Sequence, residues 1–263
     1  MLISVVIPTY NRSKHLKKTI FSLLNQQGNN NYEIIFIDDG STDDTKLIVS
    51  NFKNKIIKYY YQDNKERGAA RNLGIKKATG KYINFFDSDD LAYSTHIQTA
   101  INKIKRDRLD IFHLGHHIIY KKFKKTNNPE GDLFYRLIWG NIMLPISTFV
   151  KKSLAEEVMF SEERNLSGTE DYLFWLKILA MKRIFGYKEV TSGLVMHDGR
   201  SMIEVDPVKT EKRLKIFLSI LRNDGIHKKF YFIVKSSCYL LISLDYSIKF
   251  YKFKSFKFLL LSL

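Results

Sequence analysis

Two carboxylates stand one residue apart in Asp87-Ser88-Asp89, directly after the apolar run Tyr82–Phe86. Hard oxygen ligands at an open site suit Mg²⁺ or Mn²⁺, which keeps several waters and bridges substrate phosphates. The same residues also suit a simple turn, because Asp and Ser at a strand end commonly bond to nearby backbone. An Asp-x-Asp pair by itself therefore leaves a metal site and a turn both open.

A second acidic cluster, Asp38-Asp39-Gly40-Ser41, follows the apolar run Tyr32–Ile37. An acidic residue in this place can hold a ribose hydroxyl or a base N–H. Helix capping is the alternative, and Ser41 with Asp44 has the spacing of a capping box. Because Ser41 would serve as the cap, Asp39 stays available for a ligand.

Further along, Glu170 and Asp171 open a helical pattern that runs to Met181. A carboxylate at this point could remove the proton of an attacking hydroxyl. Acidic residues in a first helical turn also complement the helix dipole, which is the structural alternative. The chain shows no Ser-His-Asp or Cys-His set, and its single Cys238 excludes an intrachain disulfide and a Cys-based zinc site.

Short strand patterns alternate with helical patterns through the first hundred residues, which predicts an α/β fold with a parallel sheet and right-handed crossovers. Ile3–Ile7, for example, is a continuous apolar run, as expected of a strand covered on both faces. The predicted strands are Ile3–Ile7, Tyr32–Ile37, Ile56–Tyr61 and Tyr82–Phe86, and the predicted helices are Ser13–Gln26, Ser41–Phe52 and Gly68–Ala78.

Each of these strands ends in a polar cluster. In a parallel sheet, ligands gather beyond the carboxyl ends of the strands. The clusters should therefore share one edge of the sheet, which is the main structural prediction. They are Thr9-Tyr10-Asn11, Asp38-Asp39, Asp63-Asn64 and Asp87-Ser88-Asp89.

The second half of the chain is less regular. Leu109–Leu114 and Ile146–Val150 indicate strands, and Glu170–Met181 indicates an amphipathic helix. Nothing like a flexible linker separates these parts, so we expect one domain over residues 1–205, with two halves that meet near residue 105. The N-terminal run is too short for a signal sequence, and no apolar window is long enough for a transmembrane helix.

The C-terminal segment 206–263 is a basic, aromatic tail, which we expect to be helical. Residues 207–263 hold twelve Lys and Arg against three Asp and Glu, which is more than half of the formal net charge of +16. Positive charge attracts nucleic acid, acidic lipid surfaces or phosphate-bearing substrates, although biased composition explains it equally well. No nucleic-acid motif accompanies the tail, so we prefer an anionic membrane surface and expect no nucleic-acid partner. The residues that suggest membrane contact are Lys249, Phe250, Tyr251, Lys252, Phe253, Lys254, Phe256, Lys257, Phe258, Leu259, Leu260 and Leu261.

Four motifs closely resemble those of the family 2 glycosyltransferases, which have the GT-A fold. They are, in order, Pro8-Thr9-Tyr10-Asn11-Arg12, Ile37-Asp38-Asp39-Gly40-Ser41-Thr42-Asp43, Gly68-Ala69-Ala70-Arg71-Asn72-Leu73-Gly74 and Phe86-Asp87-Ser88-Asp89-Asp90. The resemblance is strong over residues 3–95 and looser to about residue 205. It implies a single Rossmann-like domain with a central, mostly parallel sheet flanked by helices. Residues 1–105 would bind a nucleotide-sugar, and residues 106–205 would bind the acceptor.

The resemblance also implies roles for single residues at the donor end. Thr9, Tyr10 and Asp39 would line the nucleobase pocket. Asp87 would contact the donor ribose or the metal shell, and Asp89 would coordinate Mn²⁺ or Mg²⁺ directly. The donor-binding residues implied are Pro8, Thr9, Tyr10, Asn11, Asp39, Gly68, Arg71, Asp87 and Ser88.

The acceptor half carries two further motifs. Glu170-Asp171 resembles the Glu-Asp motif of the family, in which Asp171 would be the general base and Glu170 would orient the acceptor or substitute as base. The segment Val195–Ser201 resembles a family segment whose histidine reaches the metal or the diphosphate. The resemblance therefore implies His197 as a metal ligand beside Asp87 and Asp89. The alternative is that His197 contacts neither group, as is usual for a single histidine in a loop. Arg200 is a weaker candidate in the same segment. Trp139 is either a sugar-stacking ring or a core residue, and the core is preferred.

The implied reaction is an inverting, metal-dependent transfer of a hexosyl or N-acetylhexosaminyl group. By family habit the donor is a UDP-sugar, and the acceptor is a glycan or lipid-linked hydroxyl, as in bacterial surface polysaccharide synthesis. We expect a cytoplasmic location, with the tail holding the enzyme peripherally at the inner face of the cell membrane. A sugar-phosphate nucleotidyltransferase is one alternative, but Pro8-Thr9-Tyr10-Asn11 is not the Gly-rich, basic loop expected there. A non-catalytic nucleic-acid or membrane-surface binding protein is the other.

Overall fold

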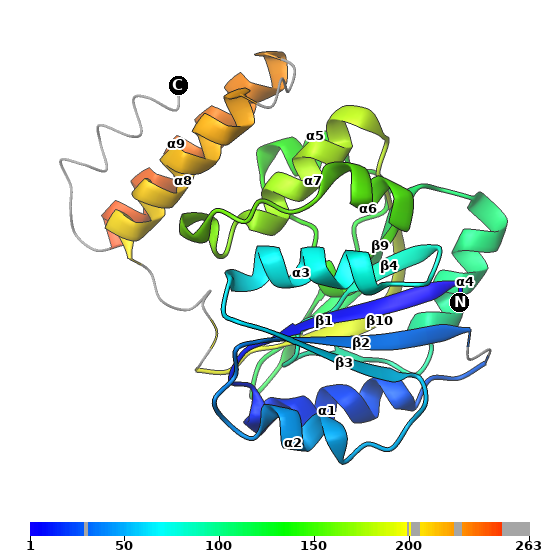
Figure 1. Cartoon of the computed structure of the whole chain (residues 1–263). Coiled ribbons are helices and arrows are strands. Elements are labelled where there is room, and N and C mark those ends of the chain that lie inside the picture. Colours follow the sequence, from blue (N-terminus) through cyan, green and yellow to red (C-terminus); the bar gives the residue numbers. More distant parts are fainter. Residues whose placement is uncertain (29–30, 199, 201–205, 224–227, 249–263) are drawn as a thin grey trace.

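The computed structural model describes residues 1–28, 31–198, 200, 206–223 and 228–248. Within these residues, ten strands form one sheet in the order β3-β2-β1-β4-β9-β6-β10-β5, with β7 paired to β6 and β8 paired to β10. Helices cover both faces of this sheet (Figure 1). The predicted α/β fold is therefore confirmed.

The N-terminal half of the sheet is parallel. β1 (Ile3–Thr9) lies between β2 (Tyr32–Asp39) and β4 (Tyr82–Phe85), and β3 (Ile57–Gln62) pairs with the other side of β2. All three pairings are parallel. Almost every residue of β1 and β2 is buried, as their continuous apolar runs predict for strands covered on both faces.

The rest of the sheet mixes both directions. β9 is antiparallel to its neighbours β4 and β6, whereas β10 runs parallel to β6. β9 follows β6 along the chain through β7, β8, α5 and η1 and pairs with β6 in the opposite direction. The predicted parallel arrangement thus describes the first half of the sheet, and the second half contains both parallel and antiparallel pairs. The strands of this second half are β5 (Leu91–Ala92), β6 (Ile111–Ile119), β7 (Lys124–Asn127), β8 (Gly131–Asp132), β9 (Thr148–Lys151) and β10 (Phe185–Val195).

The helices form a layer on each face of the sheet. One hydrophobic cluster joins α1, α2 and α4 to the sheet, and the other joins α3, α5, α6 and α7 to its opposite face. Figure 1 shows α1 and α2 below the sheet and α3 above it. The bounds are α1 (Ser13–Leu24), α2 (Thr45–Ser50), α3 (Glu66–Lys77), α4 (His96–Asp107), α5 (Phe134–Trp139), α6 (Lys152–Val158) and α7 (Glu170–Met181), with 3-10 turns η1 (Pro145–Ser147) and η2 (Arg164–Leu166).

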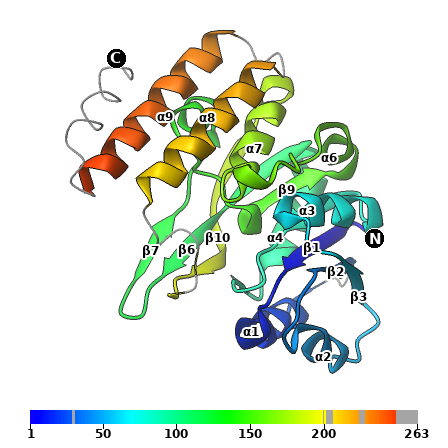
Figure 2. The same ribbon diagram turned by 60° about the vertical axis from the view of Figure 1, so that its left-hand side comes forward.

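The described part of the C-terminal segment is a helical hairpin. α8 (Pro207–Asn223) and α9 (Lys228–Ile248) lie side by side in both views (Figures 1 and 2). Phe217 of α8 stacks on Tyr172 of α7, with ring centroids 5.3 Å apart. The buried side chains of both helices belong to the same hydrophobic cluster as α5 and α7, so α8 and α9 extend the core of the domain.

The membrane hypothesis for the tail rests mainly on residues that are not described. Lys249 to Leu261, which carry the alternating lysine and aromatic pattern, lie outside the described residues. Among the helices that are described, none combines the length and the apolar character needed to cross a bilayer.

Two sequence predictions are wrong at the level of local structure. Ser41 does not cap a helix, because α2 begins four residues later, at Thr45, and the Ser41 Oγ accepts a hydrogen bond from the backbone N–H of Asn11 at 2.9 Å. Trp139 is not a core residue, since 61% of it is exposed at the end of α5.

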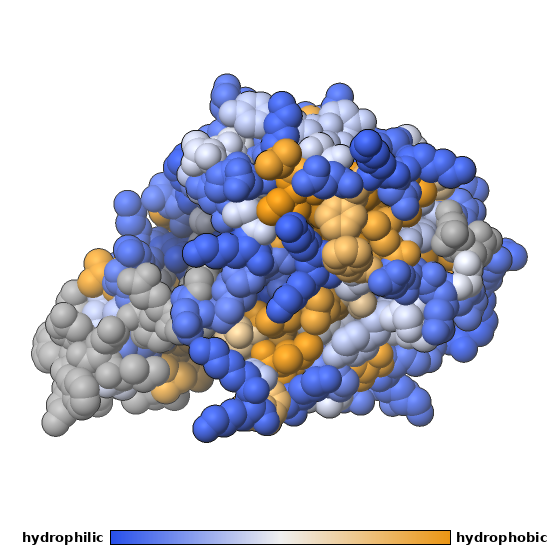
Figure 3. All heavy atoms as spheres, turned by 90° about the horizontal axis from the view of Figure 1, so that it is seen from below, coloured by the Kyte–Doolittle hydropathy of each residue, from blue (hydrophilic) through white to orange (hydrophobic). Residues whose placement is uncertain are grey.

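The underside of the molecule, where α1 and α2 lie, presents apolar side chains among charged ones (Figure 3). Phe21 of α1 and Leu47 of α2 are both exposed, and the Phe21 ring meets the edge of Phe52 at 5.1 Å. Exposed apolar residues in small groups are normal for folded proteins. The active-site residues predicted from the sequence lie elsewhere, beyond the ends of the strands.

Candidate active site

A cleft of about 470 Å³ opens at the carboxyl ends of β1, β2, β3 and β4. Each polar cluster that ends these strands contributes at least one residue to its lining, so the main structural prediction is confirmed. The N-terminus of α7 and one side chain of α8 also line the cleft. The predicted residues that line it are Pro8, Thr9, Tyr10, Asp39, Arg71, Asp87, Ser88, Asp89, Glu170 and Asp171.

Asn11 does not line the cleft but connects the loops that follow β1 and β2. Its backbone N–H donates to Ser41 Oγ, and its Oδ1 accepts the backbone N–H of Thr42 at 2.9 Å. Asn11 has a φ of +50°, a conformation that asparagine tolerates better than most residues. It thereby fixes the loop that carries Thr9 and Tyr10 into the cleft.

Asp39 is buried at the end of β2 and is held in one orientation. Its Oδ1 accepts hydrogen bonds from Gln62 Nε2 at 2.6 Å and from the backbone N–H of Lys65 at 2.9 Å. Thr9, also buried in the lining, has a hydroxyl that bonds to no described residue. A fixed carboxylate and an unpaired hydroxyl in one cleft suit a polar ligand such as a nucleoside.

Gly68 has a packing role, and it is absent from the lining of the cleft. A Cβ at Gly68 would lie 2.2 Å from the carbonyl oxygen of Ser161, so no side chain fits between α3 and the segment that follows α6. The close approach also brings Asn72 of α3 within hydrogen-bond distance of Phe160, whose backbone N–H donates to Asn72 Oδ1 at 2.8 Å. Gly68 therefore positions α3 beside the cleft.

Arg71 joins the two acidic groups of the site. Its guanidinium is fully buried and donates to Glu170 Oε1 at 2.7 Å and to Asp87 Oδ1 at 3.3 Å. The guanidinium carbon also lies 5.2 Å from the centre of the Phe160 ring. Burial alone would lower the pKa of Arg71, but Glu170 and Asp87 outweigh it and raise the pKa, so this cation is permanent.

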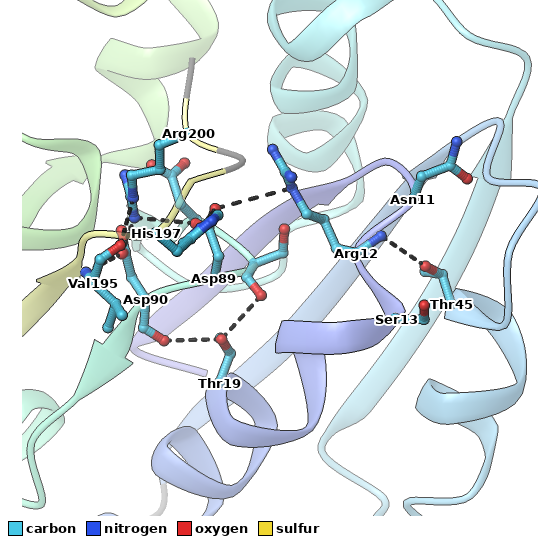
Figure 4. Close-up of polar contacts among 12 residues, drawn as sticks. Asn11, Arg12, Ser13, Thr19, Thr45, Asp89, Asp90, Val195, His197 and Arg200 are labelled. Carbon is cyan, nitrogen blue, oxygen red and sulfur yellow. Dashed lines mark hydrogen bonds and ion pairs between the residues drawn. The ribbon is translucent and has the colours of Figure 1, made fainter. Parts of the chain in front are cut away.

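Asp89 receives three positively charged or polar partners, which come from the loop after β1 and the segment after β10 (Figure 4). His197 Nε2 lies 3.0 Å from Asp89 Oδ2, and Arg200 Nη2 lies 3.2 Å from Asp89 Oδ1. Arg12 Nε lies 4.0 Å from Asp89 Oδ2. Burial raises the pKa of Asp89, but Arg200, His197 and Arg12 more than compensate, so the pKa is below its ordinary value and the group is ionised.

Asp90 and Thr19 hold this acidic loop from behind. Asp90 is fully buried, bonds to Arg200, and accepts the backbone N–H of Val195 at 2.9 Å. The Thr19 hydroxyl of α1 lies 3.0 Å from the carbonyl oxygen of Ser88 and 2.9 Å from that of Asp90 (Figure 4). The loop therefore has a fixed shape that keeps Asp87 and Asp89 at the cleft.

The donor atoms at this loop fit a hard divalent cation. Asp87 and Asp89 supply carboxylate oxygens, and His197 supplies an imidazole nitrogen beside Asp89. In the described part of the chain, no three His, Cys, Asp or Glu side chains are grouped closely enough to hold a metal by themselves. A metal here would take its remaining ligands from substrate phosphates and water, as Mg²⁺ commonly does.

The two acids of α7 differ in their surroundings. Glu170 is buried, and its Oε2 accepts the backbone N–H of Gly168 at 2.6 Å while Arg71 binds Oε1. Although burial opposes ionisation, Arg71 lowers the pKa of Glu170. Asp171 is half-buried, with Asn141 Nδ2 3.3 Å from its Oδ2, and burial together with Glu170 raises its pKa to about 6. Asp171 is thus the group that can exchange a proton near neutral pH.

Comparison with known proteins decides the family. The model of glycosyl transferase family 2 matches residues 4–159, more than half of the chain. The chain belongs to glycosyltransferase family 2. The match begins in β1 and ends just after α6, so it includes the loops that carry Asp39, Asp87 and Asp89.

Relatives of this family 2 glycosyltransferase occur in several bacteria. An uncharacterized glycosyltransferase of Rickettsia conorii is 34% identical over 232 residues, which cover 87% of this chain and 38% of the relative. The chain therefore spans well under half of that relative's length. A glycosyltransferase of Haemophilus influenzae is 30% identical over 215 residues, covering 79% of this chain and 80% of the relative. The GalNAc(5)-diNAcBac-PP-undecaprenol beta-1,3-glucosyltransferase of Campylobacter jejuni is 30% identical, covering 71% of this chain and 62% of that enzyme.

Solved structures of glycosyltransferases share the fold of this family 2 enzyme. S. aureus TarS 1-349 in complex with UDP-GlcNAc superposes with a TM-score of 0.73 at 23% identity, covering 94% of this chain and 73% of the TarS 1-349 chain. The mannosyltransferase PcManGT of Pyrobaculum calidifontis, in complex with GDP-Man and Mn²⁺, gives a TM-score of 0.68 at 15% identity, covering 97% of this chain and 73% of PcManGT. These similarities establish the GT-A fold.

The site of this family 2 glycosyltransferase also uses residues that sequence reasoning missed. Thr19 is a buried polar residue on the apolar face of α1, and that exception in the helix pattern is the signal that could have indicated it. Arg200 is a buried partner of Asp89 and Asp90, whereas the sequence suggested only a weak ligand contact. Arg213 of α8 lines the cleft, and no motif marks it.

Proposed function

We propose that this family 2 glycosyltransferase transfers a hexosyl or N-acetylhexosaminyl group from a UDP-sugar to a hydroxyl of a glycan or lipid-linked acceptor, inverting the anomeric carbon. The observation that carries the proposal is that Asp39, Asp87, Asp89 and Asp171, from three separate stretches of the sequence, line one cleft. Such a cleft can hold a nucleoside, a diphosphate with its cation, and an acceptor in sequence along its length.

The nucleoside would bind at the ends of β1 and β2. Asp39 is oriented by Gln62 and Lys65, and the buried hydroxyl of Thr9 lacks a partner among the described residues. Tyr10 is half exposed beside them, which suits stacking against a base. Arg71 would affect nucleoside binding only indirectly, because its guanidinium donates to the carboxylates of Glu170 and Asp87.

The diphosphate would bind beside the acidic loop. Asp87 and Asp89, with His197 behind Asp89, would hold Mn²⁺ or Mg²⁺. A divalent cation at this place stabilises the negative charge that the diphosphate acquires as the sugar C1–O bond breaks. Arg12 and Arg200 keep Asp89 ionised and therefore ready to bind a cation.

The acceptor hydroxyl would lose its proton to Asp171. The pKa of about 6 leaves Asp171 ionised at neutral pH and still basic enough to accept a proton. Glu170 would orient this end of the site, because Arg71 and Gly168 hold it in place. A single base opposite the leaving group gives one displacement, and hence inversion of the anomeric configuration.

The comparisons support the donor and the acceptor classes. TarS is described with UDP-GlcNAc and PcManGT with GDP-Man and Mn²⁺, while the Campylobacter jejuni relative acts on an undecaprenol-linked glycan. They favour sugar transfer over nucleotidyl transfer or nucleic-acid binding. We extend the proposal to surface polysaccharide synthesis by an enzyme that works in the cytoplasm, at the inner face of the membrane.

Donor hydrolysis measured over a panel of nucleotide-sugars with Mn²⁺ tests this proposal. We expect release of UDP from one or a few UDP-sugars and loss of release when the cation is chelated. Asp89→Ala should abolish both the metal dependence and the reaction, whereas Asp132→Ala, a carboxylate outside the cleft, should leave them unchanged. Metal-independent hydrolysis, or full activity of Asp89→Ala, would contradict the assignment of the acidic loop.

A further inference from the structure

One cation of the cleft, Arg213, has no partner among the residues that the structure describes. Arg213, from the C-terminal helix α8, lines the cleft and is half-buried. Within the described part of the chain it makes no ion pair and no hydrogen bond through its guanidinium, unlike Arg71 and Arg200, which bind buried carboxylates. An arginine that lines a polar cleft without a carboxylate partner can bind an anion there through its guanidinium.

Arg213 lies at the end of the cleft where the base is placed. Its Nη1 is 3.3 Å from the point where a Cβ on Gly168 would stand. Gly168 has a φ of +94°, and its backbone N–H donates to Glu170 Oε2. The guanidinium therefore covers the turn that leads directly into Glu170 and Asp171.

The packing of α8 fixes this position. Leu214, the next residue, is buried in the core, and Phe217 stacks on Tyr172 of α7, with the ring planes 11° apart. α8 is therefore packed directly on the helix that carries Asp171. The guanidinium is presented from a rigid element, which favours specific binding over a chance surface contact.

The neighbouring arginine in the lining is already paired with a carboxylate. Arg164 of η2 also lines the cleft, but its Nη1 lies 3.3 Å from Glu66, which partly neutralises it. Ser167 and Gly168 lie in the lining as well and connect η2 to α7. The diphosphate of the donor would be held at Asp87 and Asp89, so Arg213 remains for a second anion.

We propose that Arg213 binds a phosphate group of the acceptor, so that this enzyme glycosylates a phosphate-bearing glycan or lipid-linked sugar. The inference rests on the proposed function and adds a chemical class to its acceptor. It also makes α8, which lies beyond the residues that match the family model, a part of the active site. Phosphate close to the acceptor hydroxyl would be recognised by charge-assisted hydrogen bonds from the guanidinium.

Calorimetric titration of inorganic phosphate into the full chain, saturated with UDP and Mg²⁺, tests the proposal. Saturation with UDP fills the donor end, so a second phosphate reports on the acceptor end. We expect the wild-type chain to bind it, and Arg213→Gln to weaken binding roughly tenfold or more, as for loss of a charge-assisted hydrogen bond. Arg213→Lys should retain part of the affinity, because it keeps the charge.

Lys212→Gln is the matched control. Lys212 is an exposed neighbour on the same helix and lies outside the cleft, and its substitution removes the same charge. Equal binding of phosphate by wild type and Arg213→Gln, or no binding by wild type, would overturn the proposal. If UDP itself does not bind, the proposed function fails instead. Titration of farnesyl diphosphate or glycerophosphoglycerol in place of inorganic phosphate distinguishes the two possible sources of the acceptor phosphate. Tighter binding of farnesyl diphosphate indicates a lipid diphosphate. Tighter binding of glycerophosphoglycerol indicates a phosphodiester polymer.

Discussion

Glu170 and Asp171 are adjacent in the sequence but occupy different electrostatic environments. Arg71 binds Glu170 directly and keeps it ionised, whereas Asp171 has the amide of Asn141 as its side-chain partner. Burial and the neighbouring charge of Glu170 then raise the pKa of Asp171. Glu170 is therefore fixed in place, and the raised pKa of Asp171 suits the proton transfer proposed for it.

The pH dependence of turnover follows from this difference. Asp171 must be ionised to accept a proton, and its pKa is about 6. The rate should therefore rise tenfold for each pH unit below about 6 and level off above it. A profile of kcat/KM from pH 4.5 to 8 checks this expectation, and a rate that stays constant down to pH 4.5 would contradict it.

Arg71 should be important for folding as well as for the site. Arg71→Met would leave the buried Glu170 without its cation, and breaking a buried ion pair in this way costs about 3–5 kcal/mol. Urea denaturation would measure the change in the free energy of unfolding. The double variant Arg71→Met with Glu170→Gln should recover part of the loss, and Arg106→Met, which removes an exposed cation, should have little effect. Equal effects of Arg71→Met and Arg106→Met would contradict this account.

At the scale of elements, the sequence predicts strands and helices well where burial alone decides the pattern of apolar residues. β1 and β2 follow continuous apolar runs, and α7 extends from Glu170 to Met181, as its pattern indicates. β5, β7 and β8 were not predicted, because two to four residues give no periodicity and their pairing depends on distant strands.

The same limit applies within the site. The types and order of the acidic residues could be predicted, but their partners could not. Ser41 takes the backbone N–H of Asn11 rather than capping α2, and Arg71 binds an acid 99 positions away. Contacts of this range arise only when the sheet brings separate loops together.

Glu33, near the start of β2, links neighbouring segments at the end of the sheet opposite the cleft. Its ionisation predicts how the free energy of unfolding changes with pH. It accepts hydrogen bonds from Ser4 Oγ at 2.6 Å and Thr79 at 2.7 Å, and Lys58 Nζ lies 2.6 Å away. Burial favours the neutral acid, but Lys58, Ser4 and Thr79 outweigh it and lower the pKa from 4.5 to about 2. Since the folded pKa is the lower one, this stabilisation is complete above pH 4.5 and is lost as the pH falls towards 2.

Glu33→Gln should therefore lower the free energy of unfolding at pH 7 and approach wild type as the pH falls through that range. Urea denaturation at pH 7, 4 and 3 would show the difference shrinking. A difference that stays constant at all three values would mean that the charge of Glu33 does not provide the stabilisation.

At the scale of the whole molecule, the proposed function would place the donor at the end of the cleft formed by the sheet, and the acceptor at the end formed by the helices of the second half. The C-terminal hairpin belongs to this assembly, because α8 packs on α7 and contributes Arg213 to the cleft. Residues 207–248 should therefore stabilise the domain rather than form a separate tail.

Phe217→Ala tests that view. Phe217 is fully buried and stacked on Tyr172, so we expect a loss of about 3–5 kcal/mol in the free energy of unfolding. Val208→Ala, on the same helix but exposed, should change stability little. An unchanged unfolding curve for Phe217→Ala would show that the hairpin does not contribute to the stability of the core.

The proposed roles of the carboxylates, donor binding by Asp39 and Asp89 and proton removal by Asp171, are tested most directly by comparing UDP binding with sugar transfer in Asp171→Asn. Removing the base should leave the affinity for UDP and Mn²⁺ unchanged, because Asp39 and Asp89 are intact. Turnover of the UDP-sugar should fall by about 10²–10⁴-fold, the usual contribution of general base catalysis. Turnover of Asp171→Asn at the wild-type rate would contradict the proposed site.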